Sequence, residues 1–506
     1  MGLGLSVDRL HSCPTVGPPD LHPSQDFYIG PELRTNLTQE TSEEESHSSA
    51  KLFSGGGTRF GKAMLSNKST LLLVLCTFCG PLYRPADGTL SGPSAHNRIS
   101  RERGNILKNL TGTQEYENHI VTSRLDASEP VRMMYRGIRE VYNRLLGPTG
   151  MRDEGVSLQA RVPPTVPFPC DVRGFRSARP PTSVHQLRPG DFDVVAALGD
   201  SLTSATGANS RVFWELLIDN RGLSWCIGGQ GTWRTHLTLP NILKEFNPRL
   251  FGYSFADSYN VHLPSQFNVA EIIATTSDMP YNAASLVERM KSDPRVNWHK
   301  HWKLLTIMIG GNDFCSDVCY QTNATEWINR DQEKYLLTTL HYLKKTMPRT
   351  LVNLVPSPLI NLSFSIDKVQ APLTCQFVRP IECSCLYGPK YSANRNLYRL
   401  LERRFVKIME RVSHRAEFHS DDFTVVYQPF YRDASIFYRR DGKPDLSVMA
   451  IDCVHLSQKG HAVSANGLWN NMLEPTRHKT TVLRELFDDF KCPTPQNPYI
   501  RTYYNS

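Results

Sequence analysis

The sequence predicts an α/β fold built on a central, mostly parallel sheet. Four apolar runs have the length and composition of buried strands, and they cover residues 194–198, 304–309, 351–355 and 423–427. Patterns with helical spacing alternate with these runs, over residues 283–290, 334–345 and 394–412. Such alternation is typical of a parallel sheet covered by helices on both faces.

Two polar motifs directly follow expected strands. Gly199-Asp200-Ser201-Leu202 comes after the first run, and Gly310-Gly311-Asn312-Asp313 comes after the second. Ligands and catalytic groups gather at the carboxyl ends of the strands in open parallel sheets. We therefore expect both motifs at the same edge of the sheet.

A third motif, Asp452-Cys453-Val454-His455, completes a possible catalytic set. A serine hydroxyl attacks an ester slowly unless a base removes its proton. Ser201 is the candidate nucleophile, His455 the candidate base, and Asp452 the acid that orients the imidazole. The negative oxygen of the intermediate needs donors already in place, for which the backbone N–H of Ser201 and the side-chain amide of Asn312 are candidates. This chemistry predicts a serine esterase. We expect no metal and no cofactor, as the family resemblance described below implies.

Each motif alone has a simpler interpretation. Gly-Asp-Ser is a common turn, Gly-Gly-Asn-Asp can simply close a strand, and Asp-x-x-His can be a helix cap with a surface histidine. Their joint occurrence in this order favours the catalytic interpretation.

The first 165 residues have a different character from the rest of the 506-residue chain. Residues 1–63 are rich in Gly, Ser, Pro and acidic runs and are predicted to be disordered. The net charge of +8 is modest for this length, and the basic residues concentrate where turn formers and polar runs do. This pattern indicates a solvated segment rather than nucleic-acid binding.

Residues 64–82 contain the one strongly apolar stretch, Leu71–Leu82, which is too short to span a bilayer comfortably. Translation from Met64 would make it a conventional signal-peptide core, and the alternative is a buried hydrophobic segment. Residues 83–165 are predicted to be a polar linker with one amphipathic helix at about 129–146. Its arginines fall off the apolar face, at positions 132, 136, 139 and 144. The helix either packs on the domain or lies on a membrane surface.

The catalytic domain is predicted at 166–492, followed by a tail at 493–506 and no C-terminal membrane anchor. Of the 12 cysteines, nine lie after position 165, which favours an oxidising compartment and leaves at least one unpaired. A zinc site at Cys315/Cys319 and Cys383/Cys385 is a less favoured alternative. Asn323 and Asn361 lie in sequons that can carry glycans in the secretory pathway.

Longer stretches make the chain similar to the GDSL, or SGNH, hydrolases, and in particular to the membrane-associated phospholipase B group. They are residues 193–203, 221–225, 238–243, 309–313 and 468–475. The resemblance implies a three-layer α/β/α sandwich that removes acyl chains from glycerophospholipids and lysophospholipids at a membrane or micelle surface. It implies a secreted protein or one at the outer face of the plasma membrane, and it gives Ser201, Asp452, His455 and Asn312 their catalytic roles. It implies nothing about oligomeric state.

Three departures from that family matter. The family places a glycine whose N–H faces the oxyanion where this chain has Ile273, and a β-branched side chain resists positive φ. This admits a weakened enzyme or a lipid-binding pseudoenzyme, while an esterase or deacylase for other substrates is the further alternative. Members often carry several tandem copies, whereas this chain has one. Cys226 stands where a serine is usual and is the candidate unpaired thiol.

Overall fold

The computed structural model describes residues 139, 141, 145–152, 154–358 and 372–506. The segments predicted at 1–63 and 64–82 therefore lie outside the described residues, as does most of the linker predicted at 83–165. Of the amphipathic helix expected at about 129–146, residues 139, 141, 145 and 146 are described, and they are helical. No helix in the described ranges has the length and apolar character needed to cross a membrane.

The centre of the domain is a parallel four-stranded sheet with the strand order β1-β2-β3-β4. Its strands are β1 (Phe192–Gly199), β2 (Trp302–Ile309), β3 (Thr350–Pro356) and β4 (Phe423–Tyr427). All of the β2, β3 and β4 residues are buried, as expected for strands covered on both faces. The four strands expected from the sequence are confirmed. A separate pair, β5 (Phe437–Tyr438) and β6 (Pro444–Asp445), is antiparallel.

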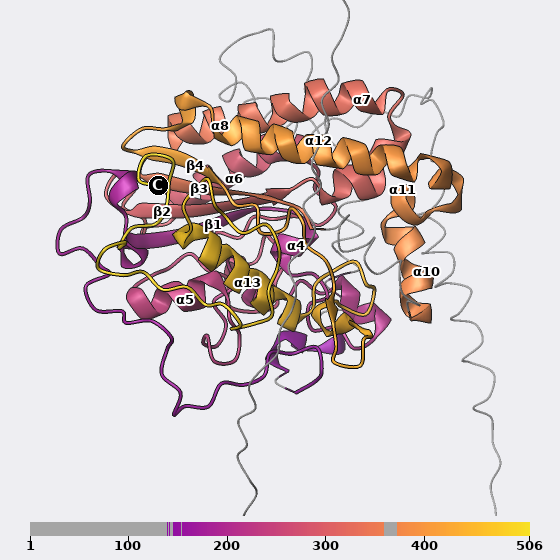
Figure 1. Ribbon diagram of the computed structural model, residues 1–506, viewed down its shortest axis with the longest axis horizontal. Coiled ribbons are helices and arrows are strands. Elements are labelled where there is room, and N and C mark those ends of the chain that lie inside the picture. Colours follow the sequence, from indigo (N-terminus) through magenta and orange to yellow (C-terminus); the bar gives the residue numbers. More distant parts are fainter. Residues whose placement is uncertain (1–138, 140, 142–144, 153, 359–371) are drawn as a thin grey trace, which may run out of the picture. The chain divides into compact units, whose positions relative to one another are not determined.

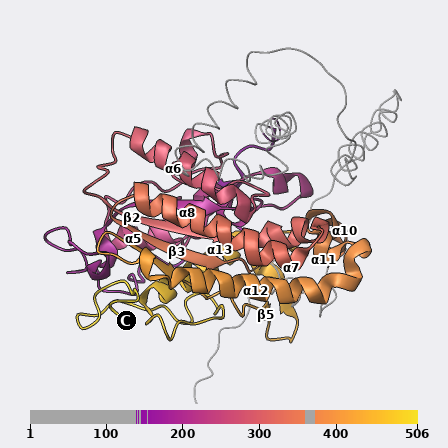
Figure 2. The ribbon, with the colours of Figure 1, turned by 90° about the horizontal axis from the view of Figure 1, so that it is seen from above.

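The domain has three layers, namely the sheet and a layer of helices on each of its two faces (Figure 1). Figures 1 and 2 show α6 (Met279–Ser292), α8 (Glu333–Thr346) and α12 (Arg395–Ser413) on one face. On the other face lie α5 (Leu239–Phe246) and α13 (Gln458–Leu473). The remaining α-helices of the described residues are α4 (Ser201–Ser204), α7 (Ala324–Glu326), α10 (Leu373–Glu382) and α11 (Ser384–Tyr387). The expected α/β/α sandwich is therefore confirmed.

The connections explain why α5 lies opposite to α6, α8 and α12. The chain moves from β1 through β4 in one direction, so right-handed crossovers place the intervening helices on one face. After β1, however, the chain first passes through α5 and bridges the other side of β1, pairing Val194 with Phe251 and Ala197 with Asn268. The direction of winding thus reverses at β1, and in open α/β sheets ligands bind at the carboxyl end of the strand where winding reverses.

The described residues before the predicted domain boundary pack on the domain. Arg139 was expected on the polar side of its helix, but it is 3% exposed and forms an ion pair with the buried Asp219. Its guanidinium lies 4.1 Å from the ring centroid of Tyr259, whose hydroxyl donates to the Arg139 carbonyl at 2.6 Å. Asp219 also pairs with the fully buried Arg221. Arg139 is buried because Asp219 lies within reach and compensates its loss of hydration.

The cysteines in the described part of the chain form four disulfides, Cys170–Cys492, Cys315–Cys383, Cys319–Cys385 and Cys375–Cys453. The zinc alternative is therefore wrong, because each of its four thiols is consumed in a disulfide. Cys226 is buried and is the one described cysteine outside a disulfide, as expected. The first bridge joins the two ends of the predicted domain.

Candidate active site

Ser201 lies at the reversal point of the sheet. β1 ends at Gly199, the Asp200 side chain caps α4 by accepting from the Leu202 N–H at 3.0 Å, and Ser201 is the first residue of that helix. The turn needs a glycine because a Cβ at position 199 would lie 2.7 Å from the Met308 carbonyl oxygen of β2. The first N–H groups of a helix have no acceptor within it, so the Ser201 N–H is available to a ligand.

His455 and Asp452 meet Ser201 from the far end of the sequence. The His455 Nε2 lies 2.9 Å from the Ser201 Oγ, and its Nδ1 lies 2.7 Å from the Asp452 Oδ2. Asp452 is fully buried, and its other oxygen accepts the backbone N–H groups of Val454 and His455 at 2.9 Å each. These bonds fix the carboxylate relative to the loop that carries the histidine. The three residues expected to act together are therefore contiguous.

The charges of this group favour a protonated histidine. Burial alone would lower the pKa of His455, but the Asp452 carboxylate and its hydrogen bond outweigh burial and raise that pKa to about 9. Burial would in turn raise the pKa of Asp452, and the charge and hydrogen bonds of His455 hold it below its usual value. An imidazole in this setting takes up a proton readily, as a general base for a weakly acidic hydroxyl must.

Asn312 follows β2 on a turn that packs tightly against α12. A Cβ at Gly310 would lie 2.5 Å from the Phe405 side chain, and the φ of Gly310 is +110°. The Asn312 Nδ2 donates to the Ala274 carbonyl oxygen at 2.9 Å. A primary amide carries two N–H donors, so this bond orients the amide and leaves one donor.

Ile273 has the positive φ that its β-branched side chain was expected to disfavour. The chain before it runs along the outer side of β1, where the Val269 and Glu271 N–H groups donate to the Ala197 and Gly199 carbonyls at 3.1 Å each. Ile273 then has a φ of +62°, in the left-handed region, and is 40% exposed. The backbone geometry typical of glycine is present, and the side chain faces partly outward. Whether its N–H serves an oxyanion stays a prediction.

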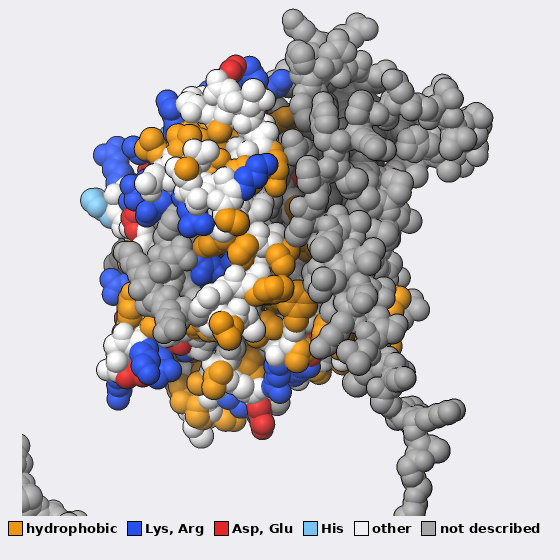
Figure 3. Space-filling view, turned by 90° about the vertical axis from the view of Figure 1, so that its right-hand side faces the viewer, with side chains coloured by type: hydrophobic (Ala, Val, Ile, Leu, Met, Phe, Trp, Pro, Cys, Tyr) orange, Lys and Arg blue, Asp and Glu red, His pale blue; other side chains and the backbone are white. Residues whose placement is uncertain are grey.

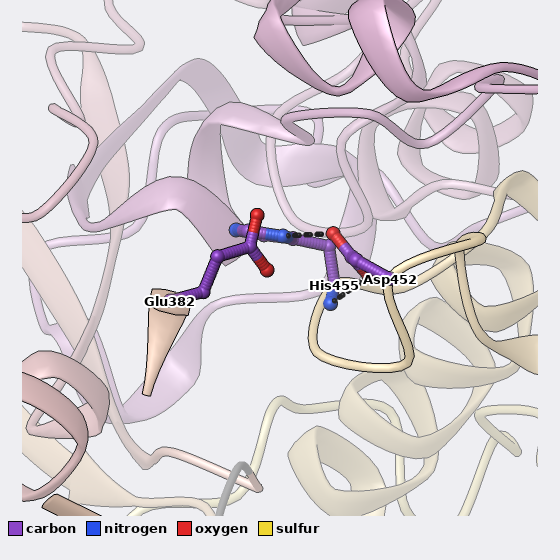
Figure 4. A group of neighbouring side chains, drawn as sticks. All are labelled: Glu382, Asp452 and His455. Carbon is purple, nitrogen blue, oxygen red and sulfur yellow. Dashed lines mark hydrogen bonds and ion pairs between the residues drawn. The ribbon is translucent and has the colours of Figure 1, made fainter. Parts of the chain in front are cut away.

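Glu382 is a neighbour of this group that the motifs did not indicate. Single ligand atoms of Glu382, Asp452 and His455 all lie within 4.8 Å of one another (Figure 4). Within this set, Asp452 and His455 already bind each other. No motif around Glu382 indicates a role in the site, because α10 brings this residue there from a distant part of the sequence. The adjacent Cys383 would have indicated this location only if its disulfide partner had been known.

Comparisons with known proteins identify the family to which the chain is similar. The profile of the GDSL-like Lipase/Acylhydrolase family matches residues 195–468. Curated relatives called "Phospholipase B1, membrane-associated" match at 40% identity in Rattus norvegicus, covering 65% of this chain and 22% of the relative. The Homo sapiens relative matches at 36%, covering 73% and 27%. This chain therefore spans about a quarter of the length of the curated relatives it matches.

Solved structures also match part of this chain. The phospholipase A1 from Streptomyces albidoflavus NA297 matches with a TM-score of 0.27 and 14% identity, covering 54% of this chain and 95% of that one. The extracellular lipase from Streptomyces rimosus matches with a TM-score of 0.28 and 14% identity, covering 53% and 94%.

Proposed function

Because the chain belongs to the GDSL-like lipase/acylhydrolase family, we propose that it is a serine esterase that hydrolyses the acyl esters of glycerophospholipids and lysophospholipids. One observation carries this proposal, namely the hydrogen-bonded chain from the Ser201 Oγ through His455 to Asp452. The names of its relatives supply the substrate class.

The first half of the reaction forms an acyl-enzyme. The Ser201 Oγ attacks the ester carbonyl carbon while His455 Nε2 takes the hydroxyl proton, and Asp452 stabilises the imidazolium. The carbonyl oxygen becomes an oxyanion, which accepts from the Ser201 N–H, the second N–H of the Asn312 amide and the Ile273 N–H. The tetrahedral intermediate collapses, the imidazolium gives its proton to the departing glycerol oxygen, and the acyl group stays on Ser201.

The second half releases the fatty acid. Water attacks the acyl carbon while His455 takes one of its protons, and the same donors stabilise the second oxyanion. Collapse returns the proton to the Ser201 Oγ and frees the carboxylic acid. All of the proton transfers use side chains already in contact, and no step requires a metal or cofactor.

The exposed side of α10 supports a lipid aggregate as the physical form of the substrate. Leu373 and Phe377 are one helical turn apart and are 81% and 68% exposed. Figure 3 shows the molecule from the side on which α10 lies in Figure 1. Hydrophobic side chains gather on the part of this face that grey atoms do not cover. Large apolar side chains that face water favour contact with a membrane or micelle.

The disulfides support a secretory location, where thiols are oxidised. The protein is therefore either secreted or held at the outer face of the plasma membrane. A different esterase or deacylase remains the alternative enzyme, and a lipid-binding pseudoenzyme the alternative without catalysis. The accessible left-handed backbone at Ile273 favours an active enzyme over the pseudoenzyme.

A fluorophosphonate probe separates these alternatives. We expect the wild type to be labelled at Ser201, and the Ser201→Ala and His455→Ala variants to lose labelling and hydrolysis while keeping their unfolding midpoints. Ser210→Ala is the matched control, because it removes a buried hydroxyl that has no hydrogen-bond partner. An unlabelled, folded wild type would identify a pseudoenzyme. Labelling with hydrolysis of short soluble esters but not of lysophospholipid micelles would identify another esterase.

A further inference from the structure

The carboxyl group of Glu382 occupies an unusual position beside His455. Glu382 is the last residue of α10. Ligand atoms of its carboxyl group, the His455 imidazole and the Asp452 carboxylate all lie within 4.8 Å of one another. Figure 4 shows Glu382 and Asp452 reaching His455 from different sides. The Glu382 Oε2 is buried and has no hydrogen-bond partner among the described residues. A carboxyl group with one buried oxygen that lacks such a partner is costly when ionised, so it favours its protonated form.

Two disulfides keep this carboxyl in place. Cys375, on the same helix, is bonded to Cys453 in the loop between Asp452 and His455. Cys383, the next residue after Glu382, is bonded to Cys315, close behind Asn312. One bridge therefore ties the start of α10 to the His455 loop, and the other ties its end to the segment after Asn312, which restrains Glu382 beside His455.

The charges around His455 make the two groups interdependent. Asp452 and Glu382 both favour the imidazolium, as does Asp200 from the end of β1, while His461 on α13 is a cationic competitor when protonated. Burial first, and then the Asp452 charge, raise the pKa of Glu382 to about 8, and the His455 charge opposes them. Two groups this close titrate as a pair with shared macroscopic steps.

We propose that Glu382 is a positioning residue that shares one proton with His455 and thereby sets the pH range in which Ser201 is activated. This inference rests on the proposed function. With one proton in the pair, either a carboxylic acid faces a neutral imidazole or a carboxylate faces an imidazolium. Only the first form has a base that can take the Ser201 proton. Loss of the shared proton leaves a neutral imidazole beside a second anion. This imidazole is a stronger base than one that faces a carboxylic acid.

The test is the pH profile of the Glu382→Gln variant between pH 5 and 10, measured as kcat/KM on a soluble ester and as the rate constant of fluorophosphonate labelling. Removal of one anion near His455 should move the acidic midpoint down by roughly one to two pH units. Glu382→Asp keeps the charge and should restore most of the wild-type midpoint. Glu402→Gln is the matched control, because burial also raises the pKa of Glu402, to about 7, away from His455. Its midpoint should equal that of the wild type.

Superimposable profiles for the wild type and Glu382→Gln would overturn the inference, as would an equal shift in Glu402→Gln. The imidazole resonances of His455 provide a readout that needs neither turnover nor a stable variant. Titration in two steps in the wild type supports proton sharing, and a single step refutes it. If Ser201 resists labelling at every pH, the proposed function fails, and the resonance titration still decides whether the proton is shared.

Discussion

Replacement of Ile273 tests the backbone conformation beside the nucleophile. A residue with a Cβ pays about 1–2 kcal/mol in the left-handed region, and glycine pays almost none. Glycine also adds about 0.4–1 kcal/mol of chain entropy to the unfolded state. Both Ile273→Gly and Ile273→Ala lose most of the side chain, which is 40% exposed, so that loss largely cancels between them. The Ile273→Gly variant should therefore have the larger unfolding free energy of the two, by about 0.5–1 kcal/mol.

Ile272 provides the matched control for this comparison. It is not among the residues with positive φ, so Ile272→Gly should be less stable than Ile272→Ala by about 0.5–1 kcal/mol. Urea unfolding of the four variants measures both differences. A glycine that is less stable than alanine at 273 as well would refute the assigned conformation. Turnover adds a second readout, since Ile273→Gly should raise it above the wild type and above Ile273→Ala if the strained backbone limits the oxyanion donor.

Three further predictions concern other parts of the site. Asn312→Ala should lower kcat by about 100-fold to 1,000-fold, the usual cost of one oxyanion donor, and a change below threefold in a folded variant would exclude that role. Cys375→Ser with Cys453→Ser opens a bridge across a sequence separation of 78 and should reduce the unfolding free energy by about 4 kcal/mol, as checked by urea unfolding; an unchanged midpoint would contradict it. Burial, and next the Asp317 charge, raise the pKa of Asp313 to about 8. Between about pH 4 and 8 the folded state keeps a proton on Asp313 that the unfolded state has lost. The unfolding free energy therefore falls as pH rises through this range, by at most about 1.4 kcal/mol per pH unit. Asp313→Asn should flatten this dependence, and an equally steep curve would count against it.

The sheet and the catalytic motifs were predictable because their signals are local. Each strand is a continuous apolar run, and Ser201 and Asn312 immediately follow two of them. Parallel strands bring their carboxyl ends to one edge, so proximity in space followed from the strand assignment alone. The His455 loop needed the family's precedent, because nothing in its spacing places it beside β1.

Features that depend on distant pairings could not be predicted. Arg139 looked like a surface residue because its helix periodicity places it off the apolar face, and only the buried Asp219 explains its location. Glu382 was not among the predicted site residues, because α10 is attached to the site by disulfides whose pairing the sequence does not show. The φ of +62° at Ile273 opposes the preference of its side chain, so local propensity gives the wrong expectation there.

The burial of Arg139 matters for anyone who designs a shorter recombinant version of the protein. A fragment that starts at residue 166, or at the family match beginning at 195, omits the guanidinium that Asp219 holds against the Tyr259 ring. The vacated space would have the shape and charge complementarity of a small planar cation. Guanidinium or methylguanidinium at millimolar concentration should then stabilise the truncated protein, whereas the full chain, with its own side chain in place, should not respond.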